Sequence, residues 1–148
     1  MSVMLDVLQG PGQPHETDWP YLPQLPTPLS AWVPPTSTGA IFQHAFSPLV
    51  GKSASEIIDQ KEAVILIVGI TEQFFYLPDP AHIQILPNDP DVGVHALLGV
   101  GTGCLGSERF ILARNSWGET WGFDGHIWIA EAYLSSRLLE MAVRGGIR

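Results

Sequence analysis

Three residue types that can together perform thiol chemistry lie in one stretch of this sequence. Residues 93–122, GVHALLGVGTGCLGSERFILARNSWGETWG, contain a histidine, an asparagine and Cys104, the single cysteine of the 148-residue chain. In such a site a thiolate attacks a carbonyl group, an imidazole carries the proton and a carboxamide orients the imidazole. The stretch therefore raises the question of whether Cys104 can reach His95.

The glycine-rich segment between two apolar runs predicts a β-hairpin. Residues 94–100 and 109–114 have the composition of strands, and GTGCLG lies between them. This segment also matches the dinucleotide-binding pattern G-x-G-x-x-G, but that pattern requires a helix next. The strand-like SERFILARN follows instead. We therefore interpret the segment as a hairpin turn.

A hairpin centred near Leu105 brings His95 and Asn115 together, because residues equally far from the centre face each other. Facing Cβ atoms lie about 4.5–5.5 Å apart. We expect the asparagine amide to donate a hydrogen bond to the imidazole and so fix its tautomer. His95 is then a candidate general base, and Asn115 is the candidate group that orients it.

The same hairpin excludes Cys104 as the nucleophile. The strand carries Cys104 roughly 25–30 Å from His95, at about 3.3 Å per residue. A nucleophile must lie within hydrogen-bond reach of its base, about 2.6–3.2 Å. We therefore interpret Cys104 as a loop thiol without a catalytic role.

The residues around the hairpin resemble the C-terminal half of papain-like cysteine peptidases, family C1. The matching stretches are GVHALLGVG and ARNSWGETWGFDGHIWI, in which a histidine strand precedes the motif N-S-W-G-x-x-W-G and a G-x-I strand. The resemblance implies that His95 is the catalytic histidine and Asn115 its orienting partner. Trp117 corresponds to the tryptophan that covers this pair, and Trp121 completes the motif. We expect both tryptophans to belong to the binding surface.

The resemblance continues upstream, more weakly, and implies the fold. MLDVLQGPGQPHETDWPYLP is similar to the family's segment where a left-domain helix ends and an extended loop begins. The implied class is α+β, with a right-hand, antiparallel, barrel-like β domain and short helices over residues 51–148. Residues 1–50 are expected to be a proline- and aromatic-rich remnant of the left domain and the crossover. Residues 1–148 would thus form a single, incomplete papain-like domain without the cysteine-bearing helix.

The family's nucleophile has no counterpart in this sequence. Its cysteine, in C-G-[SA]-C-[WY], precedes the histidine by about 130–150 residues, which places it roughly 35–55 residues before Met1. No such sequence occurs here. The family's oxyanion-hole glutamine lies just ahead of that cysteine, so Gln9 and Gln13 are not substitutes. We expect no peptide hydrolysis by this chain alone.

Four other elements are predicted from local signals. Ser53-Ala-Ser-Glu56 has the form of a capping box, so a short helix is expected from Ser53. Residues 63–70 and 126–130 are typical of strands. Apolar residues Leu134, Leu138 and Met141 predict an amphipathic C-terminal helix. Residues 1–9 are expected to end a helix at Gly10-Pro11-Gly12.

The remaining histidines and acidic residues lack the spacing of a metal site. His126 lies in the G-x-I strand, where we expect a structural role. Aspartates in the proline-rich loop 77–92 favour turn chemistry over calcium binding. We therefore predict no metal ion and no cofactor. The other residues weighed are His15, His44, His82, Asp79, Asp89 and Asp91.

Composition restricts the class of partner. Hydrophobic content of 45% with 15% charged residues predicts a globular protein, and a single cysteine excludes an internal disulfide. The net charge of −8 without a basic cluster argues against nucleic acids and anionic membranes. No apolar run is long enough to span a bilayer, and no signal peptide is visible. We expect a cytoplasmic protein.

Three functions remain open. The chain is a pseudopeptidase that binds peptides or proteins in a remnant cleft, or the His/Asn half of a split or truncated peptidase completed by another chain, or a degenerate fragment that self-associates. In each, the interdomain face with His95 and Trp117 lacks its usual cover. We expect a homo-oligomer or a partner chain to cover it, because large exposed apolar patches mark interfaces.

Overall fold

A computed structural model describes residues 2–19, 24, 26–33, 41–42, 46–48, 51–60, 62–78 and 80–144 of the chain. The chain forms two compact units, Met1–Phe46 with Gly145–Arg148 and Ser47–Arg144. His44 and Asp79 lie outside the described residues. That residues 1–50 and 51–148 together form one incomplete domain stays a prediction.

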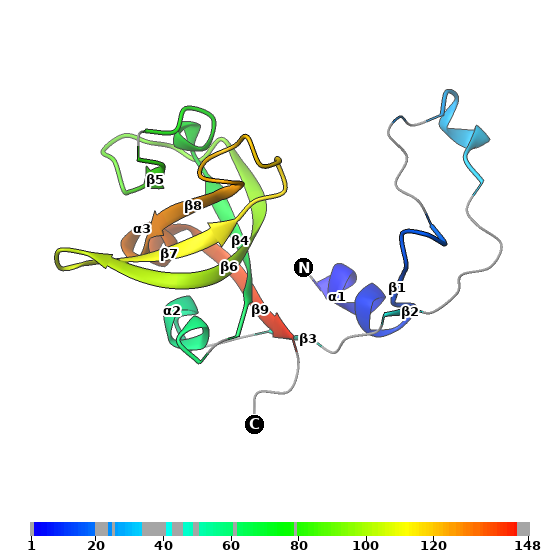
Figure 1. Cartoon of the computed structure of the whole chain (residues 1–148), viewed down its shortest axis with the longest axis horizontal. Coiled ribbons are helices and arrows are strands. Elements are labelled where there is room, and N and C mark those ends of the chain that lie inside the picture. Colours follow the sequence, from blue (N-terminus) through cyan, green and yellow to red (C-terminus); the bar gives the residue numbers. More distant parts are fainter. Residues whose placement is uncertain are drawn as a thin grey trace. The chain divides into compact units, whose positions relative to one another are not determined.

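The described residues of the first unit form few regular elements (Figure 1). Helix α1 (Ser2–Gln9) ends as predicted, because the Gly10 and Gly12 amides bond back to carbonyls of the last turns and Gly12 adopts a φ of 77°. Strand β1 (Gln13–Pro14) pairs antiparallel with β2 (Ile41–Phe42), and a 3₁₀ turn, η1, covers Leu29–Ala31. Up to Val33, the other described residues of this unit are irregular, as its prolines predict.

The second unit is a seven-stranded sheet with the order β3-β9-β4-β6-β7-β8-β5 (Figure 1). Neighbouring strands from β9 to β8 are antiparallel, and β5 joins β8 in parallel. Two helices pack on the sheet, α2 on β4 and β6 and α3 on β4, β7 and β8. The bounds are β3 (Phe46–Pro48), α2 (Ala54–Ile58), β4 (Val64–Ile70), η2 (Glu72–Phe74), β5 (His82–Ile83), β6 (Gly93–Leu105), β7 (Glu108–Arg114), β8 (His126–Ala130), α3 (Glu131–Arg137) and β9 (Leu138–Arg144).

Strand β4 forms the centre of the core. Val64, Leu66 and Val68 are fully buried and alternate with half-buried isoleucines, which is the pattern of a strand covered chiefly on one face. Helix α2 begins where the sequence predicts, because the Ser53 hydroxyl accepts from the Glu56 amide and the Glu56 carboxylate accepts from the Ser53 amide. This hydrogen bonding holds the pKa of Glu56 below its usual value.

The predicted C-terminal helix is wrong beyond Arg137. Helix α3 stops there, and residues from Leu138 onward form β9, which pairs with β4 through Met141 opposite Leu66 and Val143 opposite Val64. The central strand β4 offers unpaired backbone groups on the side away from β6. Satisfying these groups outweighs the weak local preference of the segment for a helix.

No described helix combines the length and the apolarity that crossing a bilayer requires. A location in the cytoplasm stays a prediction.

Two side chains of similar size on β9 test how this strand packs on the core. We expect Met141→Ala to lower the free energy of unfolding by about 2–5 kcal/mol, because its side chain is buried in the core. The matched control is Leu139→Ala, which removes a side chain exposed by 59% and should change stability by less than about 0.5 kcal/mol. Urea denaturation followed by circular dichroism measures both. Equal losses would contradict the burial of Met141 in the core.

Candidate active site

The hairpin that carries the site is formed by β6 and β7, but its register differs from the prediction. Leu105 pairs with Glu108, so the turn lies at Gly106, which has a φ of 62°, and is not centred on Leu105. The register then shifts between Gly99 and Gly101. As a result β7 ends with Arg114 opposite Leu98, and Asn115 is not directly opposite His95.

His95 and Asn115 nevertheless meet. One further step in this register places Asn115 opposite Leu97, which lies two residues beyond His95 on the same face of β6. Such diagonal neighbours are within reach of long side chains. His95 Nε2 lies 2.7 Å from Asn115 Oδ1, so the expected hydrogen bond between the two side chains is present.

The direction of this hydrogen bond is opposite to the one expected from the sequence. Asn115 Oδ1 also accepts from the backbone amide of Ser116 at 2.7 Å. An amide nitrogen in that position would face a second N–H group, so the oxygen must occupy it and the imidazole must donate from Nε2. In the neutral ring Nδ1 is then unprotonated. Among the described residues it has no hydrogen-bond partner, and it is free to act as a base.

The orientation of Asn115 has a cost. The residue is 7% exposed, and its Nδ2 is buried without a partner among the described residues. A buried donor left unpaired costs about 1–3 kcal/mol. The two contacts to Oδ1 therefore take precedence over satisfying the amide group. Unsatisfied buried groups of this kind call for a functional explanation, and holding the imidazole is one.

An aromatic cluster, made of Phe74, Phe75, Trp117 and Trp121, supports the histidine. The Trp117 ring lies 4.8 Å from the His95 ring between centroids, in a tilted arrangement. Phe75 stacks on Trp117 at 5.4 Å, and Trp121 meets Trp117 edge-on at 5.5 Å. Trp121 is itself fixed, because its Nε1 donates to the Phe74 carbonyl at 2.9 Å. The N-S-W-G motif predicted the tryptophans, but no sequence signal singled out the stacking of Phe75.

A tight turn after β7 presents Asn115 and Trp117. The Asn115 amide donates to the Gly125 carbonyl, and the Gly125 amide donates to the Trp121 carbonyl, both at 2.9 Å. Gly122 has a φ of 61°, and a Cβ added there would lie 2.2 Å from the His126 carbonyl oxygen. Only glycine fits this position, for both its backbone angle and its space.

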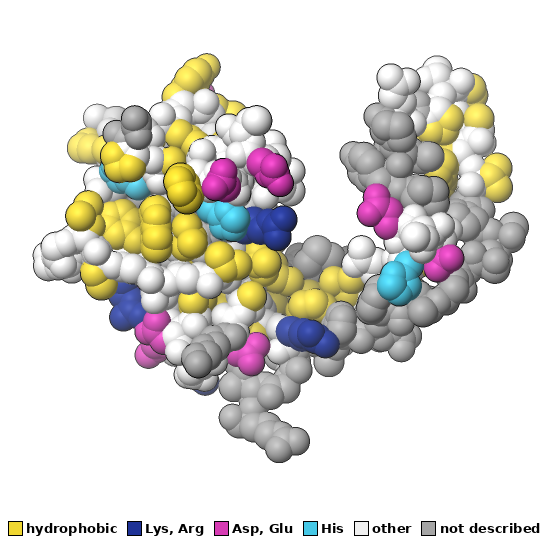
Figure 2. Space-filling view, viewed as in Figure 1, with side chains coloured by type: hydrophobic (Ala, Val, Ile, Leu, Met, Phe, Trp, Pro, Cys, Tyr) yellow, Lys and Arg dark blue, Asp and Glu magenta, His cyan; other side chains and the backbone are white. Residues whose placement is uncertain are grey.

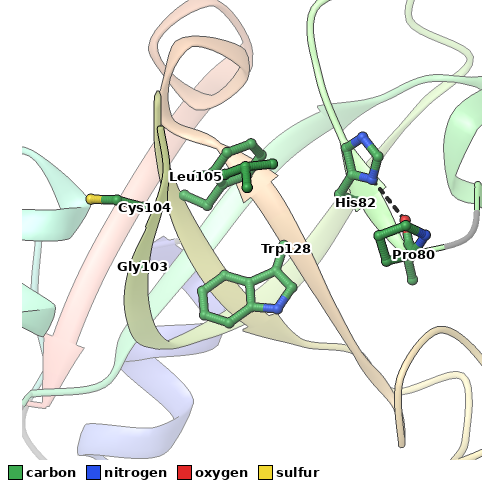
Figure 3. A pocket seen from close by; sticks show the side chains of 8 residues that line it. Pro80, His82, Gly103, Cys104, Leu105 and Trp128 are labelled. Carbon is green, nitrogen blue, oxygen red and sulfur yellow. Dashed lines mark hydrogen bonds between the residues drawn. The ribbon is translucent and has the colours of Figure 1, made fainter. Parts of the chain in front are cut away.

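Cys104 is exposed near the far end of β6, where it pairs with Arg109, while His95 lies near the start of the strand. The Cys104 backbone borders an apolar pocket of about 300 Å³ between the hairpin and Trp128. Figure 3 shows the sulfur pointing away from this pocket, whereas Leu105 lies on the side of Trp128. The thiol is thus remote from the imidazole.

The other histidines of this unit do not join the site. His126 Nδ1 lies 2.7 Å from the Asp124 carbonyl oxygen, and His82 Nδ1 lies 2.7 Å from that of Pro80. Both contacts tie a ring to its own loop. Within the described ranges, no group of three or more His, Cys, Asp or Glu side chains is arranged to hold a metal ion.

The chain belongs to the papain family. A family model described as papain family cysteine protease matches residues 54–144, which is more than half of the 148 residues. The family expected from the histidine strand and the N-S-W-G motif is therefore confirmed. A search of curated proteins found no significant match.

Solved structures confirm the α+β fold. Xylellain, a cysteine protease from Xylella fastidiosa, matches 97% of this chain and 60% of its own, with a TM-score of 0.72 and 22% identity. The Carica candamarcensis cysteine protease CMS1MS2 in complex with E-64 matches 97% and 67%, with a TM-score of 0.65 and 18% identity. Procathepsin B S9 from Trypanosoma congolense matches 95% and 51%, with a TM-score of 0.68 and 16% identity. The chain thus spans 60% of the length of xylellain.

The turn after β7 supports a direct test with two matched glycines. Gly122 and Gly106 have nearly equal positive φ, but a Cβ meets backbone only at Gly122. We expect Gly122→Ala to cost roughly 2 kcal/mol more unfolding free energy than Gly106→Ala. It should also remove the downfield Nε2–H signal of His95 from the proton NMR spectrum. An unchanged signal in Gly122→Ala would show that this turn does not hold Asn115.

Proposed function

We propose that these residues form the histidine–asparagine half of a papain-type cysteine peptidase site, completed by a thiol from outside the 148 residues. The observation that carries the proposal is the 2.7 Å contact between His95 Nε2 and Asn115 Oδ1. It keeps one proton on Nε2 and leaves Nδ1 to exchange a proton with a reacting group. A general base needs this arrangement from its third partner.

The chemistry follows from the position of the free nitrogen. Nδ1 takes the proton of an incoming thiol, and the resulting thiolate attacks the carbonyl carbon of a peptide bond. The C–N bond breaks when the imidazolium returns the proton to the leaving amine. Nδ1 then takes a proton from water, whose oxygen attacks the thioester carbonyl. The acid is released and the proton restores the thiol. Asn115 keeps the ring in the orientation that both transfers require.

This proposal assigns no nucleophilic role to Cys104. Its place on the hairpin, well along β6 from His95, is too distant for the proton transfer. These 148 residues alone should therefore not cleave peptides.

The outer side of β6, on the opposite face of the strand from His95, is an expected contact face for a partner chain. Val94, Leu98 and Val100 alternate with His95, Leu97 and Gly99 along the strand, and they are exposed by 63%, 36% and 40%. Figure 2 shows hydrophobic side chains gathered across the viewed face of this unit. An exposed apolar row of this kind favours a protein partner over open solvent.

A complementation experiment tests the half-site. The chain is mixed with, or fused behind, the cysteine-bearing left-domain segment of xylellain, and labelling by E-64 and hydrolysis of a fluorogenic peptide are measured. We expect activity only with both parts. His95→Ala should lower kcat/KM by about 10²–10⁴-fold, which is the usual contribution of a general base.

Cys104→Ser is the matched control and should leave the activity of the completed site unchanged. Labelling of Cys104 in the chain alone, or activity that needs Cys104, would contradict the proposal. If the chain forms dimers by light scattering and neither part changes the other, the fragment that only self-associates becomes the better interpretation.

A second function, peptide binding without cleavage, is favoured by one feature of the surface. Beside the aromatic cluster lies a groove of about 730 Å³ bordered by Phe75, Trp121, Phe123 and two prolines, Pro78 and Pro80. Phe75 and Phe123 are exposed by 55% and 72%. Exposed aromatic side chains along a groove are suited to holding an extended apolar peptide.

This second function predicts saturable quenching of tryptophan fluorescence by peptides rich in aromatic residues. Phe123→Ala should weaken the affinity by about tenfold, as truncation of an interface aromatic commonly does. Leu105→Ala removes an equally exposed side chain at the hairpin and should change nothing. Equal effects of the two variants would argue against a specific groove.

A further inference from the structure

Arg137, the last residue of α3, lies at the point where the chain enters β6. Its Nη1 lies 2.5 Å from Asp91 Oδ1, and its Nη2 lies 2.5 Å from the Asp89 carbonyl oxygen. The arginine side chain is 17% exposed, so it is well sheltered for a charged group. Arg137 thus binds two residues of the loop that leads to His95, Asp91 through its carboxylate and Asp89 through its backbone carbonyl.

Asp91 connects Arg137 to the central strand β4. A Cβ added at Gly69 would lie 2.5 Å from Asp91 Oδ2, so the carboxylate rests directly on the β4 backbone. The next amide, that of Val92, donates to the Ile70 carbonyl at 2.8 Å. From there β6 pairs with β4 residue by residue, Gly93 with Ile70, Val94 with Gly69 and His95 with Val68. The loop and the strand register are therefore fixed at one place.

Tyr133 also contacts the β4 backbone at Gly69, where Asp91 rests. It is fully buried, and its hydroxyl donates to the Gly69 carbonyl at 2.9 Å. Burial raises the pKa of Tyr133, so the phenol keeps the proton that it donates. The Arg137 guanidinium lies 5.0 Å from the centre of the Tyr133 ring, a cation–π distance. Arg137 is thus oriented by the ring while it binds the loop.

The side chain of Gln73 also binds the loop before β6. Gln73 Nε2 lies 2.5 Å from Asp89 Oδ2 and 2.9 Å from the Gln84 carbonyl oxygen, and Gln73 Oε1 accepts from the Gln84 amide. Asp89 is consequently bound through its carboxylate by Gln73 and through its carbonyl by Arg137. The loop before β6 is held on both sides.

We propose that Arg137 is a positioning residue for His95, acting through Asp91 and the Asp89 carbonyl to fix the start of β6. The His95–Asn115 hydrogen bond requires that the histidine enter the strand in one register, because Asn115 is set by the separate turn after β7. Arg137 locks the histidine side of this pair. The importance of this role for catalysis rests on the proposed function, but the position of the ring can be measured without activity.

The test uses NMR of the full chain, with the hydrogen-exchange rate of the His95 Nε2–H and the ¹⁵N shifts of its ring as readouts. We expect Arg137→Gln to speed this exchange by at least about tenfold, which corresponds to the loss of one charge-assisted hydrogen bond from a local opening equilibrium. The ring shifts should move toward a mixture of tautomers. Arg137→Lys, which keeps the charge but not the two-pronged geometry, should rescue the exchange rate in part.

Arg109→Gln is the matched control. Arg109 also pairs with an aspartate, Asp59, but at the opposite end of the hairpin from His95. Arg109→Gln should lower the melting temperature without changing the His95 exchange rate by more than about twofold. If Arg137→Gln destabilises the fold to the same degree and leaves His95 equally protected, Arg137 is only structural and the inference is overturned.

Asp91→Asn decides the matter if Arg137→Gln does not fold, because it keeps the shape of the side chain above Gly69 and removes only the charge. Asp91→Asn should speed exchange of the His95 Nε2–H as Arg137→Gln is expected to do. An exchange rate like that of the unmodified chain would reject the positioning role of Arg137. Complementation activity reports on the proposed function separately. If complementation fails but Arg137→Gln changes the His95 exchange rate, the half-site is rejected and the positioning role is kept. If complementation succeeds but the His95 exchange rate does not change, the half-site is kept and the positioning role is rejected.

Discussion

The hydrogen bond from His95 Nε2 to Asn115 Oδ1 is the constraint on which the site depends. It decides which ring nitrogen carries the proton, and therefore which one faces the reacting groups. The Ser116 amide makes the assignment unambiguous by occupying the same oxygen. Asn115 Nδ2 has no partner among the residues that the structure describes, so this geometry is maintained against a local cost.

The two partners of this bond are fixed by different parts of the fold. Asn115 is placed by a turn that only glycine at position 122 permits. His95 is placed by strand pairing with β4, which is anchored where Arg137 meets Asp91. Because the two supports are independent, the pair forms only when both elements are correctly folded. Such preorganisation is what allows a base to act without first being reordered.

Membership in the papain family explains the scaffold, and the hairpin separates the Cys104 thiol from His95. A thiol at the end of a long hairpin cannot share a proton with an imidazole near its start. The exposed apolar side of β6, on the face of the strand opposite to His95, is suited to contact with another protein surface. Proposed as a half-site, the unit combines an oriented base with a face suited to docking.

The sequence by itself determined the family, the pairing of a histidine with an asparagine, the cap of α2 and the central apolar strand, because each depends on residues that are near one another in the chain. The tertiary structure decided the rest. A bulge in β6 and a turn at Gly106 set the register, the Ser116 amide reversed the expected hydrogen bond, and the unpaired side of β4 converted the predicted C-terminal helix into β9. These outcomes depend on backbone groups that meet only after the chain has folded, so no local pattern of residue types encodes them.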